Sequence, residues 1–347
     1  MRSLIESGIA VLAAALFTTG DARSSFGFYS DINDYLMNAP YSEALAGADL
    51  GTSSGIFPAS TPANLAFDSL NTLSLSYANY FHNTFSTSLL SFSSQAGENI
   101  GYGVTLGYTF LPDVEITANS DTSENGDPVY DPEIISLSRI YFRAGLGWKY
   151  HLNKSVIIAA GGAINGGRVN LSEYRGYSIG MDLGTRVLFS DPGISLAISF
   201  ENIVRSVVYW SESYRQRVSP HIRVGIGWER EFPYIYGKVL IVYCTPDLLS
   251  NEGINYIGSD ELADGVGIEG PEFRRVSRNP SMLFTAGRYG LEYTIMSRLA
   301  LRVGLTQGKF SFGAGVNLFG GRAGLDFAYS SVMAFAGASQ ISLTYRW

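Results

Sequence analysis

The chain of 347 residues contains one cysteine, Cys244, so no internal disulfide bond can form. Charged residues make up only 16% of the sequence, and the net charge of −7 comes without any run of basic residues. This balance argues against a nucleic-acid partner. The three histidines, at positions 82, 151 and 221, are far apart and lack the spacing of metal ligands. We therefore expect no metal site and no cofactor.

Long hydrophobic runs are also missing. The apolar run from Ile9 to Phe17 has nine residues, whereas a transmembrane helix needs about 20. Because Arg2 precedes this run and Gly20 and Ala22 follow it, residues 1–22 are typical of a secretory signal peptide cleaved after Ala22. An N-terminal membrane anchor is the alternative, for which the run is short. The chain is then expected to be exported, either as a soluble protein or as a barrel in the outer membrane.

Motifs of enzymatic chemistry are absent from the sequence as well. No Gly-x-Ser-x-Gly elbow occurs, and nothing connects a histidine to a nucleophile. Glycine-rich pieces such as Gly161-Gly162 and Gly313-x-Gly315 lack the lysine and the strand–helix context of a phosphate loop. We expect that the protein is not an enzyme, and that inward glycines make room for bulky neighbours or for a plug.

Glycine, tyrosine and phenylalanine are abundant, at 39, 22 and 20 residues, which favours closely packed, aromatic-rich strands. The last seven residues, Ile341 to Trp347, alternate apolar and polar side chains and end on an aromatic residue. Residues 139–150 alternate in the same way. Since successive side chains of a strand point to opposite faces, such segments have one apolar and one polar face. Their repetition predicts an all-β fold, a transmembrane antiparallel β-barrel.

The alternation predicts fourteen strands, an even number as bacterial barrels require. Connections that would face the periplasm are short, namely 94–99, 151–153, 190–192, 231–233, near 297 and 320–321. Long connections all fall on the other side, at 111–136, 165–176, 204–216 and 245–281, and we expect these to be external loops. The expected strands are 70–79, 84–93, 100–110, 137–150, 154–164, 177–189, 193–203, 217–230, 234–244, 282–296, 298–306, 309–319, 322–331 and 336–347.

Three regions of the chain are expected: the signal peptide at 1–22, a segment at 23–69 and the barrel at 70–347. The segment 23–69 does not alternate, and it is either disordered or packed inside the barrel as a hatch. Its apolar residues, such as Leu45 and Leu65, favour the hatch because a free tail would expose them.

The inward faces of the predicted strands carry charges of both signs. This favours a neutralising network that fills the lumen and holds the hatch, rather than a wide open pore. The predicted members are Arg139, Arg143, Asp182, Arg186, Glu201, Arg223, Glu229, Arg288, Glu292, Arg302 and Asp326.

The two longest connections are acidic. Residues 111–136 contain seven acidic residues and no lysine or arginine. We interpret them as solvated surface loops. A cation site or a basic partner is the alternative, although the spacing matches no calcium loop.

Three stretches resemble the PorV/PorQ branch of the FadL-like outer-membrane proteins. The first is the hatch element Thr61, Pro62, Ala63, Asn64 and Leu65 with the following strand at 73–78. The second joins Gly180-Met181-Asp182-Leu183-Gly184 to 196–203, and the third runs from 301 through 312–316 to 325–329 and the final strand. The resemblance implies a barrel of fourteen strands with an N-terminal hatch.

The resemblance also implies two functions. Relatives in this branch act in type IX secretion and bind secreted proteins, while the wider group moves fatty acids or other hydrophobic compounds. The first is the main hypothesis here and the second is the alternative. An architectural barrel without transport is a third possibility. The expected partners are outer-membrane lipid, the barrel-assembly machinery and type IX cargo or translocon. The barrel is expected to be monomeric. Tyr345 and Trp347 are expected to belong to the C-terminal insertion signal. Candidate contacts for cargo are Leu248, Leu249, Ile254, Tyr256, Ile257 and Phe273.

Overall fold

The computed structural model describes most of the barrel and parts of the segment before it. The described residues are 39–52, 61–80, 84–122, 128–171, 174–203, 207–210, 215–217, 220–248, 280–306, 309–332 and 335–347. The predicted signal peptide and the candidate contacts Leu249, Ile254, Tyr256, Ile257 and Phe273 lie outside these ranges.

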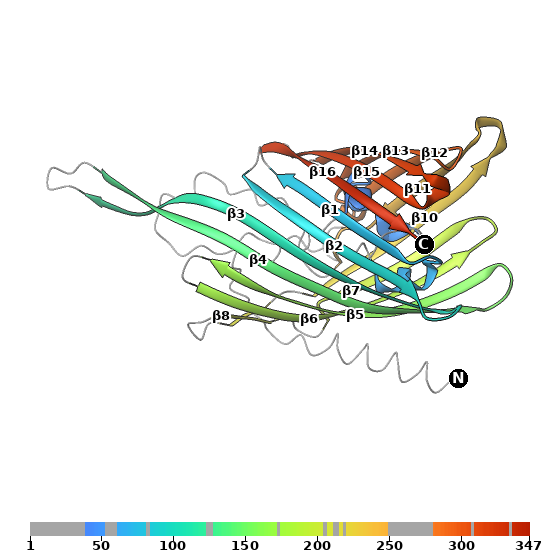
Figure 1. Ribbon diagram of the computed structural model, residues 1–347, viewed down its shortest axis with the longest axis horizontal. Helices are drawn as coiled ribbons and strands as arrows, with labels where there is room; N and C mark the ends of the chain where they lie inside the picture. Colours follow the sequence, from blue (N-terminus) through green and yellow to red (C-terminus); the bar gives the residue numbers. More distant parts are fainter. Residues whose placement is uncertain are drawn as a thin grey trace.

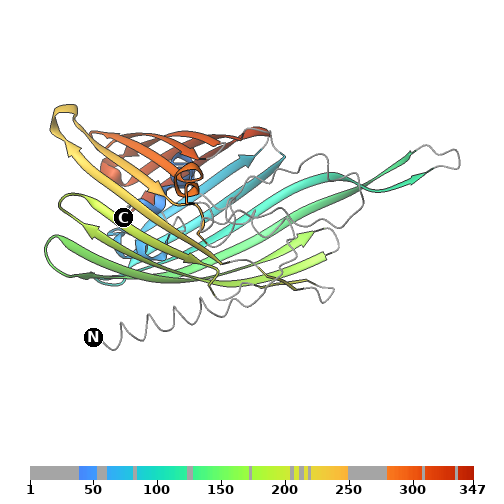
Figure 2. The same cartoon turned by 180° about the vertical axis from the view of Figure 1, so that it is seen from behind.

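The described strands form one antiparallel sheet that closes on itself (Figures 1 and 2). Sixteen strands are present in it, and β8 and β9 extend from part of β6 instead of joining the ring. The other fourteen close the barrel, because β1 pairs with β16 and β5 pairs with β6. The predicted fold and strand number are therefore confirmed.

The strand bounds agree with the sequence pattern to within a few residues at most ends. The first eight strands are β1 Thr72–Tyr80, β2 Phe85–Gln95, β3 Ile100–Thr122, β4 Pro128–His151, β5 Val156–Leu171, β6 Tyr174–Phe189, β7 Ile194–Glu201 and β8 Val207–Trp210. The others are β9 Arg215–Arg217, β10 His221–Phe232, β11 Gly237–Cys244, β12 Arg288–Ile295, β13 Leu299–Thr306, β14 Lys309–Leu318, β15 Ala323–Val332 and β16 Phe335–Arg346.

The barrel has apolar side chains outside and polar side chains inside, the reverse of a water-soluble protein. On β16 the apolar Leu343 is 58% exposed on the outer face, while the adjacent Thr344 is 1% exposed inside. On β4, Ile140 and Leu146 point outward and Arg143 is buried in the interior. An apolar exterior around a polar interior suits a wall in contact with hydrocarbon, where every backbone group must pair within the sheet. In the described residues, no helix is both long and apolar enough to cross a membrane.

The two ends of the barrel differ in their connections and strand extensions, as the alternation of loop lengths in the sequence predicts. Tight turns join β2–β3, β4–β5, β6–β7, β10–β11, β12–β13 and β14–β15 at one end, which we assign to the periplasm. At the other end, β3 and β4 continue well beyond the rest of the ring (Figure 1).

Three expectations about the long connections were wrong. Residues 111–136 are not a loop, because β3 and β4 continue as a paired hairpin up to Thr122 and Pro128. The β-branched residues of this stretch favour strand. Likewise β5 and β6 extend through most of 165–176, and β8 and β9 lie within 204–216.

Residues 282–285 also differ from the expectation, which made them the start of a strand. They form the helical turn α4, Met282–Thr285, and β12 begins only at Arg288. Apolar residues in a short run cannot by themselves distinguish a helical turn from a strand.

Candidate functional site

The lumen is crossed by three short elements that precede the first strand: α3 Pro40–Ala44, η1 Asp49–Gly51 and η2 Pro62–Phe67. Pro40 and Pro62 each occupy the start of a helical turn, where the missing N–H is tolerated. Between α3 and η1, Ala46 and Gly47 adopt positive φ angles of 54° and 75°, which reverses the chain. We call residues 39–52 and 61–69 the plug; the predicted hatch element 61–65 belongs to it.

The plug contacts strands around nearly the whole ring. Helix α3 packs on β13 to β16, η1 on β7, β10 and β11, and η2 on β2 to β6. Its apolar side chains Leu45, Leu50 and Leu65 are almost fully buried. The blue plug segments lie inside the ring in Figure 2, toward the end that bears the tight turns. The plug therefore packs inside the barrel.

Inward glycines of the wall let the plug backbone approach closely. A methyl group on Gly161 of β5 would lie 2.5 Å from the carbonyl carbon of Pro62, and one on Gly225 of β10 would lie 2.6 Å from that of Leu50. Both distances are shorter than carbon atoms tolerate. The expectation that inward glycines make room for a plug is met at these two positions.

Arg186 of β6 bonds to both parts of the plug and to the wall. Its Nε donates to the Asn64 side-chain oxygen at 2.8 Å, and its Nη2 donates to the Leu50 carbonyl at 2.8 Å. Its Nη1 donates to the Ser195 hydroxyl of β7. The side chain is fully buried, with an exposed fraction of 0%. Three neutral acceptors thus surround one buried guanidinium, which fixes η1, η2 and β7 relative to each other.

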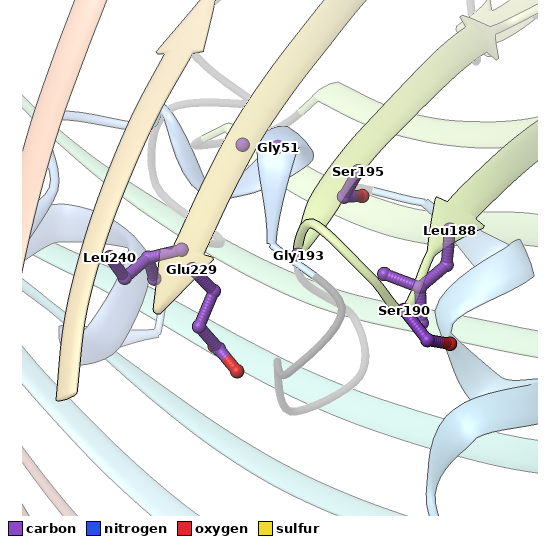
Figure 3. Close-up of a pocket in the computed structure, with 8 residues that line it drawn as sticks. Gly51, Leu188, Ser190, Gly193, Ser195, Glu229 and Leu240 are labelled. Atoms are coloured by element: carbon purple, nitrogen blue, oxygen red, sulfur yellow. The ribbon is translucent and has the colours of Figure 1, made fainter. Parts of the chain in front are cut away.

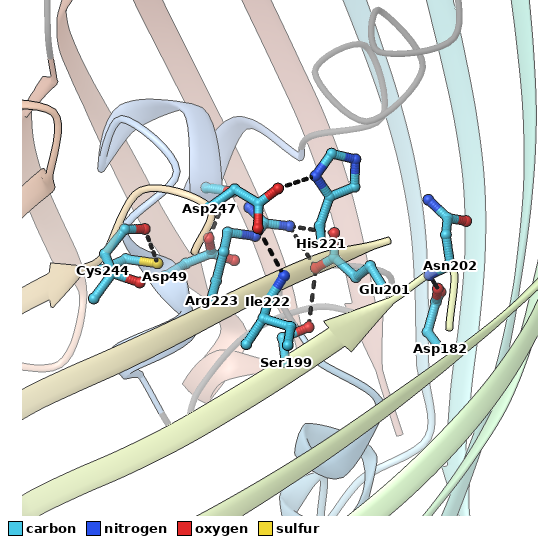
Figure 4. A network of polar contacts seen from close by, with 12 residues as sticks. Asp49, Asp182, Ser199, Glu201, Asn202, His221, Ile222, Arg223, Cys244 and Asp247 are labelled. Atoms are coloured by element: carbon cyan, nitrogen blue, oxygen red, sulfur yellow. Dashed lines mark hydrogen bonds and ion pairs between the residues drawn. The ribbon is translucent and has the colours of Figure 1, made fainter. Parts of the chain in front are cut away.

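A first cluster of ion pairs lies on β4, β6, β7 and β10. Figure 4 shows its members Asp182, Glu201 and Arg223. Arg143 pairs with Asp182 at 2.9 Å, and Arg223 pairs with Glu201. Asp182 also accepts hydrogen bonds from the Asn165 amide at 2.9 Å and the Asn202 backbone N–H at 3.0 Å.

A second cluster lies on the opposite part of the wall, on β12, β13 and β15. Arg302 bonds to Glu292 and to Asp326, each at 2.6 Å. Its guanidinium carbon also lies 4.6 Å from the centre of the Tyr41 ring, so this cluster holds α3 by a cation–π contact.

The remaining charged residues of the predicted network do not join the two clusters into a single network. Arg139 and Arg288 are buried inward, and Arg288 lies beside Gly47 of the plug. Glu229 pairs with Lys238 at 3.1 Å, apart from both clusters and near the tight turns. The sequence predicted which faces carry these charges, but it could not divide them into groups, because strand order and register decide which side chains meet.

Other buried polar contacts were not predicted. His221 Nδ1 lies 2.5 Å from a carboxylate oxygen of Asp247, whose second oxygen accepts the Ile222 N–H at 2.8 Å. Glu43 of α3 pairs with Lys309 of β14. No local pattern in the sequence signals these pairs, because their members lie in the plug, in the segment after β11 and on strands.

Asp49 of η1 is buried between plug and wall. Its Oδ1 accepts a hydrogen bond from the Ser42 hydroxyl at 2.7 Å. Burial raises the pKa of this carboxyl, against the opposing effects of Ser42 and Arg223.

The other predicted residues have simple positions. Leu248 follows β11 and is half-buried. Tyr345 and Trp347 lie on the outer face near the tight turns, with stacked rings 5.7 Å apart. Cys244 is the buried last residue of β11. In the described part of the chain, no group of three or more His, Cys, Asp or Glu residues could hold a metal ion.

Several solved structures are similar to this chain. The P. putida toluene transporter TodX has 12% sequence identity and a TM-score of 0.48, covering 83% of this chain and 93% of its own. A Pseudomonas aeruginosa FadL homologue has 10% identity and a TM-score of 0.43, covering 86% of this chain and 97% of its own. The KdgM porin has 7% identity and a TM-score of 0.36, covering 80% of this chain and 99% of its own. No protein-family model matches the sequence, and no curated protein matches it.

The location follows from the barrel itself. Fourteen antiparallel strands, an apolar exterior, a polar interior and tight turns at one end are the features of a barrel that spans the bacterial outer membrane. The outer-membrane location predicted from the sequence agrees with this architecture.

Proposed function

We propose that the protein is an outer-membrane passage for small hydrophobic compounds. The observation that supports this most directly is the plug, which occupies the lumen and contacts nearly every strand of the wall. A lumen filled in this way is unsuited to free diffusion of hydrophilic solutes. It suits a route that opens for particular molecules.

An apolar patch inside the lumen supports the chemical class of the transported compound. It consists of Ala78 and Tyr80 of β1, Phe85 of β2 and Ala338 of β16. The Tyr80 and Phe85 rings stack with centres 4.5 Å apart, at the ends of their strands opposite the tight turns. These side chains make the outer end of the lumen apolar on this side, which favours apolar over hydrophilic molecules there.

Uptake by cells tests this proposal. Cells that express the barrel should accumulate radiolabelled toluene faster than cells without it, and vesicles containing the barrel should remain closed to arabinose. Replacing Tyr80 and Phe85 together with serine should lower toluene uptake, whereas serine at the lipid-facing Leu75 of β1 should not. Equal permeation of toluene and arabinose would contradict the proposal.

A second candidate is the protein-binding role in type IX secretion, and one feature of the backbone favours it. Beyond Phe110 and Leu137, the described parts of β3 and β4 pair only with each other, so both edges of this hairpin lack a neighbouring strand. Such edges can accept an extended segment of another protein.

Capture from outer membranes distinguishes the two candidates. The full chain and a variant in which a short turn joins Leu111 to Leu137 would be used as baits. Recovery of secreted proteins by the full chain alone would support the secretion role. Recovery of lipid without any secreted protein would rule it out.

A further inference from the structure

A cavity of about 200 Å³ lies between the plug and the wall, at the end of the barrel that bears the tight turns (Figure 3). Strands β6, β7, β10 and β11 supply its wall, and Gly51 of the plug closes one side. The lining residues are Gly51, Leu188, Ser190, Gly193, Ser195, Gly227, Glu229 and Leu240. Ser190 is exposed and, like Gly193, belongs to the tight turn between β6 and β7, so the cavity adjoins the periplasmic end.

Arg186 borders this cavity on the side of the lumen. Two of its three acceptors are linked to the cavity directly, since Ser195 lines it and Leu50 precedes Gly51 in the chain. Along the inward face of β6, Asp182 of the first ion-pair cluster comes before Arg186, and Leu188 and Ser190 come after it. Arg186 therefore lies between the charged part of the lumen and the cavity.

The contacts of Arg186 are suited to reversible release. Its acceptors in the structure are a carbonyl, an amide oxygen and a hydroxyl, all neutral. The carboxyl group of Asp49 in η1 interacts with Arg186 electrostatically, but no carboxylate is among the hydrogen-bond acceptors of Arg186. Exchanging these hydrogen bonds for water therefore does not require a bonded ion pair to be broken.

The lining of the cavity indicates what it can hold. Leucine, serine and glycine predominate, and the single carboxylate, Glu229, is paired with Lys238 at 3.1 Å. Such a lining suits a small uncharged molecule with an apolar body and favours neither anions nor cations.

We propose that this cavity is a binding site for small neutral molecules on the periplasmic exit of the passage, and that Arg186 is the positioning residue that keeps the exit closed. When Arg186 releases the Leu50 carbonyl, η1 can move from β7 and β10, and the lumen becomes continuous with the cavity. This inference rests on the proposed transport of hydrophobic compounds, and it specifies where they leave.

Cysteine labelling tests the exit. Ser190→Cys places a thiol at the cavity mouth, and Leu152→Cys, in the tight turn between β4 and β5, is the matched control at the same end of the barrel. The purified proteins would be modified with a negatively charged methanethiosulfonate and reconstituted into vesicles, with naphthol as the probe. Wild-type protein treated in the same way accounts for the buried Cys244.

Two readouts are expected to agree. Naphthol should slow the modification of Ser190→Cys and leave that of Leu152→Cys unchanged. Modified Ser190→Cys should lose naphthol flux down to that of empty vesicles, while modified Leu152→Cys keeps the wild-type flux. If modified Ser190→Cys shows neither protection nor loss of flux while the wild type transports naphthol, the exit lies elsewhere and the inference is wrong, although transport itself stands. Absence of naphthol flux in the wild type would overturn the proposed function, and the exit with it.

The role of Arg186 has its own readout. Arg186→Ala should increase naphthol flux, and modification at Ser190→Cys in the double variant should abolish the increase. If Arg186→Ala instead loosened the barrel as a whole, modification of Ser190→Cys in the double variant would not block the added flux. That result would overturn the role of Arg186. Arg186→Lys keeps the positive charge but has fewer hydrogen-bond donors in a fixed geometry, so it should raise flux to a smaller extent. This variant can be used if Arg186→Ala does not fold.

Discussion

At the scale of single residues, polar side chains of the plug are positioned by wall residues that are distant in the sequence. Asn64 and Arg186 form a hydrogen bond across 122 positions of the chain. The resemblance of residues 61–65 to a hatch element identified Asn64 as a residue of interest, and alternation placed Arg186 inside. Their contact could not be predicted, because it depends on how η2 lies across β6.

Asp68, between η2 and β1, gives a prediction about pH. Burial raises the pKa of its carboxyl from 3.8 to about 6, although Arg346 acts in the opposite direction. Because the folded state then binds the proton more tightly than the unfolded state, the free energy of unfolding should fall as pH rises from about 4 to 6 and stay lower above, by at most about 3 kcal/mol. Hydrogen exchange of residues 61–69, corrected for intrinsic rates, measures this. Asp68→Asn should reduce the dependence and leave the part that comes from Asp49, whereas Asp191→Asn in an exposed turn should retain all of it. An unchanged slope in Asp68→Asn would contradict the assignment.

At the scale of elements, the strands were predictable and the plug was predictable only in outline. Apolar and polar or small residues alternate without interruption along strands such as β13 and β16, because one face meets lipid and the other the lumen. The type of each residue therefore indicates the face on which it lies. The length of the β3–β4 hairpin was underestimated because the acidic composition of residues 111–136 is typical of a loop. The turns of the plug are too short for any periodicity, and they adopt their form against the wall.

A pair of adjacent glycines tests the packing between plug and wall. Gly161 faces η2, whereas Gly162 faces outward, where a methyl group would lie 3.3 Å from the flexible Leu183 side chain. Gly161→Ala should weaken the docking of η2 by about 1–3 kcal/mol, as overpacking does. Hydrogen exchange of residues 62–67 should become faster by about 5- to 140-fold, since each 1.4 kcal/mol is a factor of ten. Gly162→Ala should leave this exchange unchanged, and equal effects of the two substitutions would show that η2 does not rest on β5.

At the scale of the whole molecule, closure of the ring depends on the first and last strands. Strand β1 pairs with β16 over its whole length, from Thr72 opposite Arg346 to Tyr80 opposite Ala338. A pair of backbone hydrogen bonds between Asn71 and Trp347, each 3.1 Å long, extends this pairing beyond the strand ends. The alternation of the C-terminal segment predicted its faces, but the sequence did not show which strand it would join.

Cysteine pairs test the closure and its register. Leu75 of β1 lies opposite Leu343 of β16, and both point outward. Opposite residues of antiparallel strands have Cα atoms about 4.5–5.5 Å apart, within the range of a disulfide bond. Oxidation of Leu75→Cys/Leu343→Cys should give a cross-linked product that migrates differently on a denaturing gel after free thiols are blocked. Leu75→Cys/Leu301→Cys, with its second cysteine on β13, should give none; cross-linking of both pairs, or of neither, would contradict the register.

The position of the plug in the chain has a consequence for biogenesis. The plug precedes every described strand in the chain, yet it is enclosed by a wall whose seam joins β1 to β16, the last of the described strands. We expect the plug to dock on the nascent wall before the seam forms, because its contacts with nearly every strand are made more easily in an open sheet than in a closed cylinder. Once β1 and β16 have paired, the plug can still rearrange inside the barrel, but the closed wall hinders its release.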